Sequence, residues 1–192
     1  MRIPENSGDV DKWLRLIRAD GVGPVTFARL LKRFGSVDAA LGASVAGLAK
    51  VEGIGYKTAE RIAASRGAFD AEAELERAGK LGVWLVHMED ARYPTVLKQI
   101  YDPPPVLYVR GTLGREDNLG IAIVGSRRCS LYGQEQASRL AHLLAAGGFT
   151  IVSGLARGID SHAHEGALAA GGKPGWDLLF VSLLVGGVYI HN

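Results

Sequence analysis

The pattern of hydrophobic and polar positions is most regular between Ile121 and Leu168. A short apolar stretch, residues 121–124, is typical of a strand buried on both faces. From Leu131 the apolar positions follow a helical period. A second apolar stretch, residues 149–152, predicts another strand, and a further helix follows it. The predicted apolar face of the first helix consists of Ala137, Leu140, Ala141 and Leu144.

This β-α-β-α order predicts a parallel sheet covered by helices. In such sheets ligands lie at the carboxyl ends of the strands, beside the first turns of the helices. A glycine-containing turn with arginine follows each predicted strand, at residues 125–128 and 153–158. Both turns therefore fall where a parallel sheet places its ligand.

The composition of the two turns predicts anion binding. Glycine lets the backbone approach a ligand, hydroxyl groups donate hydrogen bonds, and guanidinium groups suit phosphate. The alternative is that the glycines only close tight turns and the arginines are solvated. We predict a phosphate- or nucleic-acid-binding site. The residues assigned to it are Gly125, Ser126, Arg127, Arg128, Ser130, Ser153, Gly154, Arg157 and Gly158.

The absence of two known motifs from the sequence narrows the range of phosphate ligands to be considered. No G-x-G-x-x-G follows the first strand, which weakens NAD or FAD binding, and no G-x-x-x-x-G-K-[ST] occurs, which argues against a P-loop NTPase. No serine–histidine–acid order or paired carboxylates stand out, so we expect neither an enzyme nor a cofactor. An α/β enzyme acting on a nucleotide phosphate is the alternative, but it would need an acidic motif such as G-G-x-G-T-x-x-E, which the chain lacks.

Asp160, His162, His164 and Glu165 form a group that resembles a metal site in composition. Residues two apart on a helix point in nearly opposite directions, so His162 and His164 do not share a metal easily. We expect no metal here. The sequence instead suggests that Asp160 caps its helix and that His164 is a packed or hydrogen-bonded histidine.

Residues 122–172 closely resemble the DNA-processing protein A family (DprA, also called Smf). The resemblance rests on a G-S-R turn at 125–127, an S-x-Y-G helix start at 130–133 and an S-G-x-A-x-G-I-D turn at 153–160. It implies a Rossmann-like domain, single-stranded DNA binding and a homodimer. It also implies a role in natural transformation, in which the protein protects incoming single strands and loads the RecA recombinase.

Residues 11–66 predict a compact helical module. Helical patterns at 11–19 and 25–34 are separated by the glycines of residues 21–24. The stretch 51–62 resembles a helix-hairpin-helix motif, and Gly21–Leu30 is a weaker copy, so the module looks like a tandem pair. Such hairpins hold a DNA phosphate with backbone N–H groups or serve only in packing. The candidate phosphate contacts here are Gly53, Gly55 and Lys57.

Gly67 is the predicted boundary between two domains, residues 1–66 and 67–192. The fold class expected is therefore α/β, with an all-helical helix-hairpin-helix (SAM-like) domain before an incomplete Rossmann-like parallel-sheet domain. The family resemblance extends over residues 11–172. We expect the strands at 83–87 and 106–109 to extend the parallel sheet, and we assign them no chemistry.

Charge is distributed unevenly along the chain. The net charge is only +2, but residues 1–66 hold eleven Lys and Arg against seven Asp and Glu, whereas residues 67–120 hold six against nine. The single cysteine, Cys129, excludes an internal disulfide and suits a reducing compartment. The first twenty residues lack the apolar core of a signal peptide. We therefore expect a cytoplasmic protein without a membrane segment.

The sequence departs from the family pattern after Gly172. The family continues with a third strand of the sheet, DNA-contacting lysines and a dimerisation helix. We interpret residues 173–192 as a divergent tail on a C-terminally truncated chain, caused by a frameshift or a gene-annotation error, with a genuine short form as the alternative. We expect the apolar run 178–190 to pair beside the Ile121 strand as a surrogate. The short form should then bind DNA weakly, and its dimerisation and RecA loading should be impaired. A stable but inert fragment is a further alternative.

Overall fold

The computed structural model describes residues 4–113, 120–154, 156–170, 180–182 and 189–191. The chain forms two compact units. The first comprises Glu5–Tyr93 and Leu97–Leu107, and the second comprises the described residues from Tyr108 onward together with Pro4 and Pro94–Val96. The mixed α/β class is confirmed, with a helical N-terminal part followed by a part that contains parallel strands.

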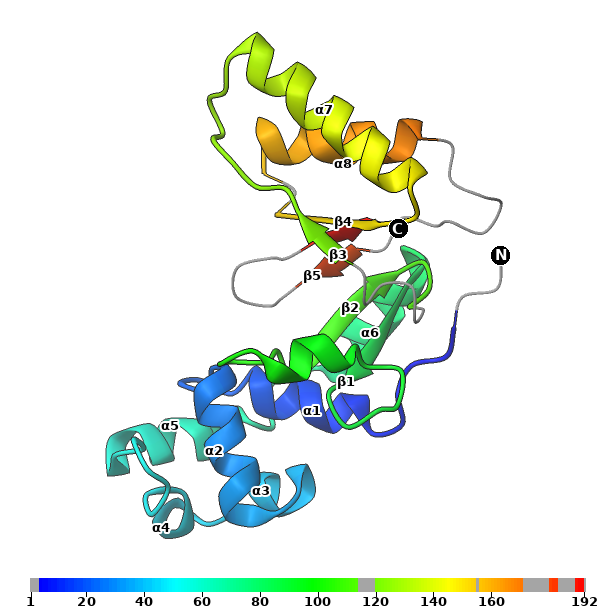
Figure 1. Cartoon of the computed structure of the whole chain (residues 1–192). Coiled ribbons are helices and arrows are strands. Elements are labelled where there is room, and N and C mark those ends of the chain that lie inside the picture. The colour runs from blue at the N-terminus through cyan, green and yellow to red at the C-terminus, as the bar shows by residue number, and fades with distance from the viewer. Residues whose placement is uncertain (1–3, 114–119, 155, 171–179, 183–188, 192) are drawn as a thin grey trace. The chain divides into compact units, whose positions relative to one another are not determined.

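Elements before residue 111 are mostly helices (Figure 1). The helices are α1 (Val10–Ile17), α2 (Pro24–Phe34), α3 (Val37–Gly42), α4 (Val45–Leu48), α5 (Tyr56–Ser65) and α6 (Ala71–Lys80). They are followed by strand β1 (Val83–His87), the 3-10 helix η1 (Thr95–Gln99) and strand β2 (Val106–Arg110).

Short polar residues fix where several of these helices begin. The hydroxyl of Ser36 accepts the N–H of Ala39 at 3.2 Å, and Asp70 accepts the N–H of Ala73 at 3.0 Å. Each bond satisfies a donor that the first helical turn leaves without a partner. Gly35 ends α2 in the left-handed conformation with φ of 79°, which glycine adopts without strain.

The predicted tandem pair of hairpins is present in the backbone of the first unit. The N–H of Val22 donates to the carbonyl of Ala19 at 3.0 Å between α1 and α2. The N–H of Ile54, 32 positions later, donates to the carbonyl of Val51 at 3.0 Å between α4 and α5. The two hairpins therefore repeat one backbone geometry, and the weaker copy seen in the sequence is a true copy in structure.

Helix α1 is enclosed from two directions within the first unit. Trp13 stacks on Phe27 of α2, with ring centroids 5.2 Å apart, and on His87 of β1, with centroids 4.6 Å apart. Helix α6 also packs on α1, and the N–H of Ser7 donates to the carbonyl of Leu85 at 2.9 Å. The boundary expected at Gly67 thus falls inside the first unit, and independent folding of residues 1–66 stays a prediction.

The second unit contains the predicted β-α-β-α order. Its elements are β3 (Gly120–Ala122), α7 (Leu131–Ala146), β4 (Thr150–Ser153), α8 (Ile159–Ala169), β5 (Phe180–Ser182) and β6 (Tyr189–His191). Strands β3 and β4 pair in parallel with Ile121 opposite Ile151. The N–H of Ile123 continues the pairing with the carbonyl of Val152 at 2.9 Å. The parallel pair and the helix between its strands confirm the sequence interpretation.

Helices α7 and α8 lie on one side of β3 and β4 (Figure 1). The core between them contains Ala141, Ile151 and Ala163, all fully buried. Burial of the first strand on both faces was a wrong expectation, because Gly120 and Ala122 of β3 are exposed and Ile121 between them is half-buried. Leu140 was also misplaced on the buried face of α7, and it is 52% exposed because α8 covers the neighbouring stripe of the helix.

The strand order differs from the sequence expectation. Strand β2 pairs with β1 and β5 in a sheet of its own and does not extend the sheet of β3 and β4. Strand β6 pairs antiparallel with β4, on the edge away from β3, and β5 pairs with β2, so neither described strand of the tail pairs beside Ile121. Residues 171–179 and 183–188 lie outside the described residues. The apolar pattern predicted strands correctly, but it contains no information about which edge each strand would join.

Candidate functional site

Two serines shape the turn that follows β3. The hydroxyl of Ser126 accepts the N–H of Arg128 at 3.1 Å, which folds the turn back on itself. The hydroxyl of Ser130 accepts the N–H of Gly133 at 3.2 Å and so caps α7. Both hydroxyls are exposed and keep further hydrogen-bonding capacity toward a ligand.

The turn after β4 packs directly against the turn after β3. The N–H of Ile159 donates to the carbonyl of Ser126 at 3.2 Å. Gly158 has φ of 87°, and a Cβ there would overlap the Ser126 carbonyl and lie 2.9 Å from the backbone of Arg127. Only glycine allows this approach. The structure therefore brings the two sequence-predicted turns together at the carboxyl ends of β3 and β4.

Asp160 joins the two turns from the interior. Its side chain is buried and accepts the N–H of Gly125 at 3.2 Å. The expectation that Asp160 caps its own helix is wrong, because α8 begins at Ile159 with Gly158 as its N-cap. A Cβ on Gly154 would lie 2.8 Å from the Asp160 carboxylate, which explains the glycine after Ser153.

Ser153 and Gly125 are committed to the fold rather than open to a ligand. The buried Ser153 hydroxyl donates to the carbonyl of Ile123 at 2.6 Å. The N–H of Gly125 is taken up by Asp160. These residues hold the site in shape, while the groups oriented outward are the hydroxyls of Ser126 and Ser130 and the arginines.

Three arginines surround the paired turns without acidic partners. Arg127, Arg128 and Arg157 are exposed. Within the part of the chain that the structure describes, none of them forms an ion pair or a side-chain hydrogen bond. Guanidinium groups that are not neutralised by the fold are available to bind phosphate bidentately.

The histidines of α8 have separate structural environments. His164 is buried, and burial lowers its pKa to about 4, with the Asp160 carboxylate acting in the opposite direction. The Nδ1 atom of His162 lies 2.9 Å from a carboxylate oxygen of Glu165 on the exposed side. Among the described residues, no three His, Cys, Asp or Glu side chains are grouped to hold a metal ion.

The second hairpin of the first unit places its candidate residues at the surface. Gly53, Gly55 and Lys57 are all exposed, and Gly55 is the N-cap of α5 without a side-chain cap. The guanidinium of Arg29 donates to the carbonyl of Glu52 at 3.2 Å and lies against Gly53. Arg29 was not singled out in the sequence, although an arginine recurs 32 positions later at Arg61, which is the signal that could have identified it.

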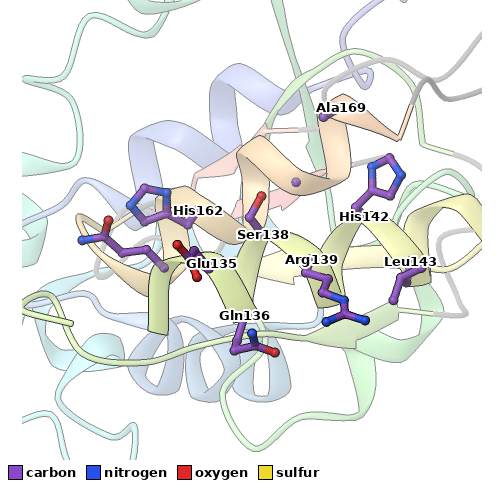
Figure 2. A pocket seen from close by; sticks show the side chains of 10 residues that line it. Glu135, Gln136, Ser138, Arg139, His142, Leu143, His162 and Ala169 are labelled. Carbon is purple, nitrogen blue, oxygen red and sulfur yellow. The ribbon is translucent and has the colours of Figure 1, made fainter. Parts of the chain in front are cut away.

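A pocket of about 660 Å³ lies along α7 and α8 (Figure 2). Its lining includes Glu135, Arg139 and His142 from α7 and His162 from α8. It has one carboxylate, Glu135, and one guanidinium, Arg139, whereas the exposed charges of the paired turns are the three arginines. The pocket therefore lacks the character of a phosphate site, and the sequence assigned no residue in it.

Comparison with known proteins agrees with this arrangement. A family model described as DNA recombination-mediator protein A matches residues 84–174, and one described as a DprA-like N-terminal HHH domain matches residues 9–76. The chain belongs to the DNA recombination-mediator protein A family. The family is concerned with DNA processing for recombination, and the matched ranges include the residues of both strand-end turns and of the helical hairpins.

Two members of the family illustrate the relation. Protein Smf of Synechocystis is 36% identical over 165 residues, which are 84% of this chain and 42% of that protein. The DNA processing protein DprA of Bacillus subtilis is 37% identical over 97 residues, which are 48% of this chain and 31% of that protein. The chain therefore spans less than half the length of these relatives.

A solved structure shows the same fold. The X-ray structure of DNA processing protein A from Streptococcus pneumoniae superposes with a TM-score of 0.63 at 25% identity, covering 88% of this chain and 56% of that one. None of the described helices is both long and apolar enough to cross a membrane.

Proposed function

We propose that this chain binds single-stranded DNA through the paired turns after β3 and β4. The contact between Gly158 and the backbone of Ser126 and Arg127 carries the proposal, because it gathers at one edge of the sheet three arginines that have no acidic partner among the described residues. Parallel sheets bind ligands at that edge. The family membership supports DNA as the source of the phosphate.

The chemistry proposed is binding rather than catalysis. Arg127, Arg128 and Arg157 neutralise backbone phosphates, and the hydroxyls of Ser126 and Ser130 add hydrogen bonds. Such contacts read the backbone and not the bases, so the site would accept strands of any sequence. The glycines and Ser153 would keep the two turns close together.

A wider role follows from the same proposal. The family resemblance suggests that a bound strand is protected in the cytoplasm and passed to the RecA recombinase during natural transformation, by a protein that acts as a homodimer. The hairpin residues Gly53, Gly55 and Lys57 are proposed as a weaker contact to DNA phosphate. The chain matches less than half the length of these relatives. The protection of DNA, the RecA loading and the homodimer are therefore proposed for a full-length member of the family.

An Arg127→Ala variant tests the site. We expect single-stranded DNA binding to weaken by about 1–3 kcal/mol, because a charge-assisted contact is lost. The loss should be equal for an oligothymidylate and a mixed-sequence oligonucleotide. The salt dependence should become shallower by about 0.7 in the slope of log K against log salt. Fluorescence anisotropy measures each quantity.

Arg139→Ala is the matched control, because it removes the same charge from an exposed position on α7. Its affinity for the oligonucleotide should stay close to that of the unchanged chain. Equal affinities for the Arg127 and Arg139 variants would exclude Arg127 from the site, and an inert fragment would bind neither oligonucleotide.

A further inference from the structure

A pocket on the surface of the first unit gathers four cationic side chains. It has a volume of about 240 Å³ and lies where α2 approaches the residues that follow α4. The residues that line it are Arg29, Lys32, Arg33, Lys50, Val51 and Glu52. We refer to it as the α2 pocket.

The cations of the α2 pocket outnumber its single carboxylate. Arg29, Lys32 and Arg33 occupy one face of α2, because residues three and four apart are neighbours on a helix. Arg29 approaches Glu52, with Nη2 at 3.5 Å from the carboxylate. Lys32, Arg33 and Lys50 are exposed and form no ion pair with any residue that the structure describes.

The tandem hairpins show which of these cations the fold itself uses. Arg29 lies against the second hairpin and contacts Glu52, while Arg61, 32 positions later, donates two hydrogen bonds of 2.8 Å to Asp20 of the first hairpin. Each arginine thus covers the hairpin of the other repeat. Arg29 has a structural duty that the repeat requires.

Lys32 and Arg33 have no such duty. The positions 32 residues later carry Ala64 and Ser65 on α5, in a helix that makes the same hairpin and buries Ile62. Ser65 does contribute to the fold, because its hydroxyl accepts the N–H of Asp20 at 2.8 Å. Lys32 and Arg33, in contrast, are exposed and form no ion pair or side-chain hydrogen bond with any residue that the structure describes.

Lys50 differs from its counterpart in the same way. The equivalent residue of the first repeat, Arg18, lies over the ring of Phe69 at 5.1 Å and approaches the carboxylate of Glu74 at 3.9 Å. Lys50 has neither an aromatic nor an acidic partner among the described residues. Arg18 of the first repeat thus interacts with neighbouring side chains, whereas Lys50 of the second repeat has no such partner among the described residues.

We propose that the α2 pocket binds the phosphate backbone of a nucleic-acid strand, at a site separate from the paired turns of the second unit. Lys32, Arg33 and Lys50 are exposed, which suits a polyanion that binds by counterion release more than a small anion in a fixed cradle. Because Val51 and Glu52 line the pocket, it borders the second hairpin, whose glycines present backbone N–H groups. A strand contacting that hairpin would continue along α2.

The test replaces Lys32 and Arg33 with the residues of the other repeat. The double variant Lys32→Ala, Arg33→Ser installs side chains that the same fold already carries on α5. We expect affinity of the full chain for a fluorescein-labelled twenty-nucleotide oligothymidylate to fall about fivefold near 0.1 M salt. The salt slope should become shallower by about 1.4, the value for two lost phosphate contacts. A duplex of the same length shows whether double-stranded DNA is a second source of the phosphates.

The double variant Arg77→Ala, Lys80→Ala is the matched control, since it removes two exposed charges from α6 outside the pocket. Its affinity for the oligothymidylate should remain within twofold of the unchanged chain. The same weakening in both double variants would show a general charge effect and overturn the α2 pocket.

Glu52→Gln provides a second test with the opposite sign. Removing the only carboxylate of the pocket should strengthen oligothymidylate binding by about twofold, an outcome that damage to the fold would not produce. Unchanged or weaker binding by this variant would overturn the proposal.

Combination with Arg127→Ala separates the two sites. The effect of Lys32→Ala, Arg33→Ser should persist in that background if the α2 pocket binds independently. If only Arg127→Ala weakens binding, the proposal for the α2 pocket fails. If only Lys32→Ala, Arg33→Ser weakens binding, the proposal for the paired turns fails.

Discussion

Both compact units place arginines beside glycine turns, yet they use them differently. In the first unit Arg61 donates to Asp20 and Arg29 contacts Glu52, so each arginine stabilises a hairpin of the neighbouring repeat. In the second unit Arg127 lies beside a glycine turn and has no acidic partner among the described residues. Arginine and glycine together therefore stabilise the hairpins of the first unit, whereas in the second unit they leave an exposed positive charge.

An acidic residue before the glycine accounts for the difference. Asp20 precedes Gly21 and Glu52 precedes Gly53, so each hairpin supplies its own partner for an arginine. The turn after β3 has Val124 before Gly125, and the acid that approaches it, Asp160, is buried and bonds to backbone. A guanidinium without a carboxylate in reach is the better candidate for a phosphate ligand.

Dividing the first unit should produce the largest change. A fragment of residues 1–66 lacks α6 and β1, so Trp13 loses its stacking on His87 and one side of α1 is exposed. If this fragment folds alone, we expect its unfolding free energy to be about 4 kcal/mol lower than that of residues 5–107. Circular dichroism melts of the two fragments measure the difference. Equal melting temperatures would place the domain boundary at Gly67 after all.

Two glycine substitutions compare the turns directly. Gly158→Ala should cost about 3 kcal/mol of unfolding free energy, because the new Cβ meets backbone atoms of Ser126 and Arg127 that have no room to move. Gly53→Ala should cost about 1–2 kcal/mol, because the Cβ there meets the end of the Arg29 side chain, which can rotate away. Urea denaturation of both variants gives the order. A larger loss for Gly53→Ala would contradict the tighter contact between the strand-end turns.

Acid should destabilise the second unit through His164. Its pKa is about 4 in the folded chain, against about 6.5 for an unfolded histidine. Between these values the unfolded chain binds more protons, so stability is full above about pH 6.5 and is lost as the pH falls toward 4. We expect a loss of about 2 kcal/mol between pH 7.5 and pH 4.5 that is missing in His164→Gln. Parallel stability curves for the two proteins would argue against this assignment.

The smallest effects should separate the two kinds of arginine. Arg61→Ala removes both hydrogen bonds to Asp20 and should lower the melting temperature of the first unit while leaving oligonucleotide affinity unchanged. Arg127→Ala should leave the melting temperature unchanged and weaken binding. A shift of both properties in either variant would show that the two uses of arginine overlap.

Local elements were predictable because their signals are local. Helix α7 begins after Ser130 and ends before Gly147, as its cap and its glycines indicate. The strand at 83–87 has the predicted bounds, and the turns at 125–128 and 153–158 follow their strands as expected. The hairpin copy at Gly21 was also readable, since its glycines recur at the same spacing as those of the second hairpin.

The pairing of the strands and the hydrogen-bond partners of buried polar side chains were not predictable in the same way. Strand β2 has the apolar pattern of a sheet strand, but it joins β1 and β5 instead of β3. Asp160 has the position of a helix cap, but its carboxylate bonds to Gly125 at the start of another turn, 35 residues away. Ser153 was expected to donate a hydrogen bond to a ligand, but its hydroxyl donates to the carbonyl of Ile123 instead.

The helices, the strands and the two glycine–arginine turns follow from local sequence signals, because caps, glycines and apolar periods act over a few neighbouring residues. Three contacts could be seen only in the folded chain. Gly158 approaches the Ser126 backbone, the Asp160 carboxylate accepts the N–H of Gly125, and Arg29 contacts the hairpin of the other repeat. These outcomes depend on which distant backbone groups come within hydrogen-bond distance once the sheet and helices pack. Arg127 and Arg29 are identical residues near glycine turns, and the packing that brings Arg29 to Glu52 of the other repeat makes it a part of the fold, whereas Arg127 stays a candidate ligand for DNA.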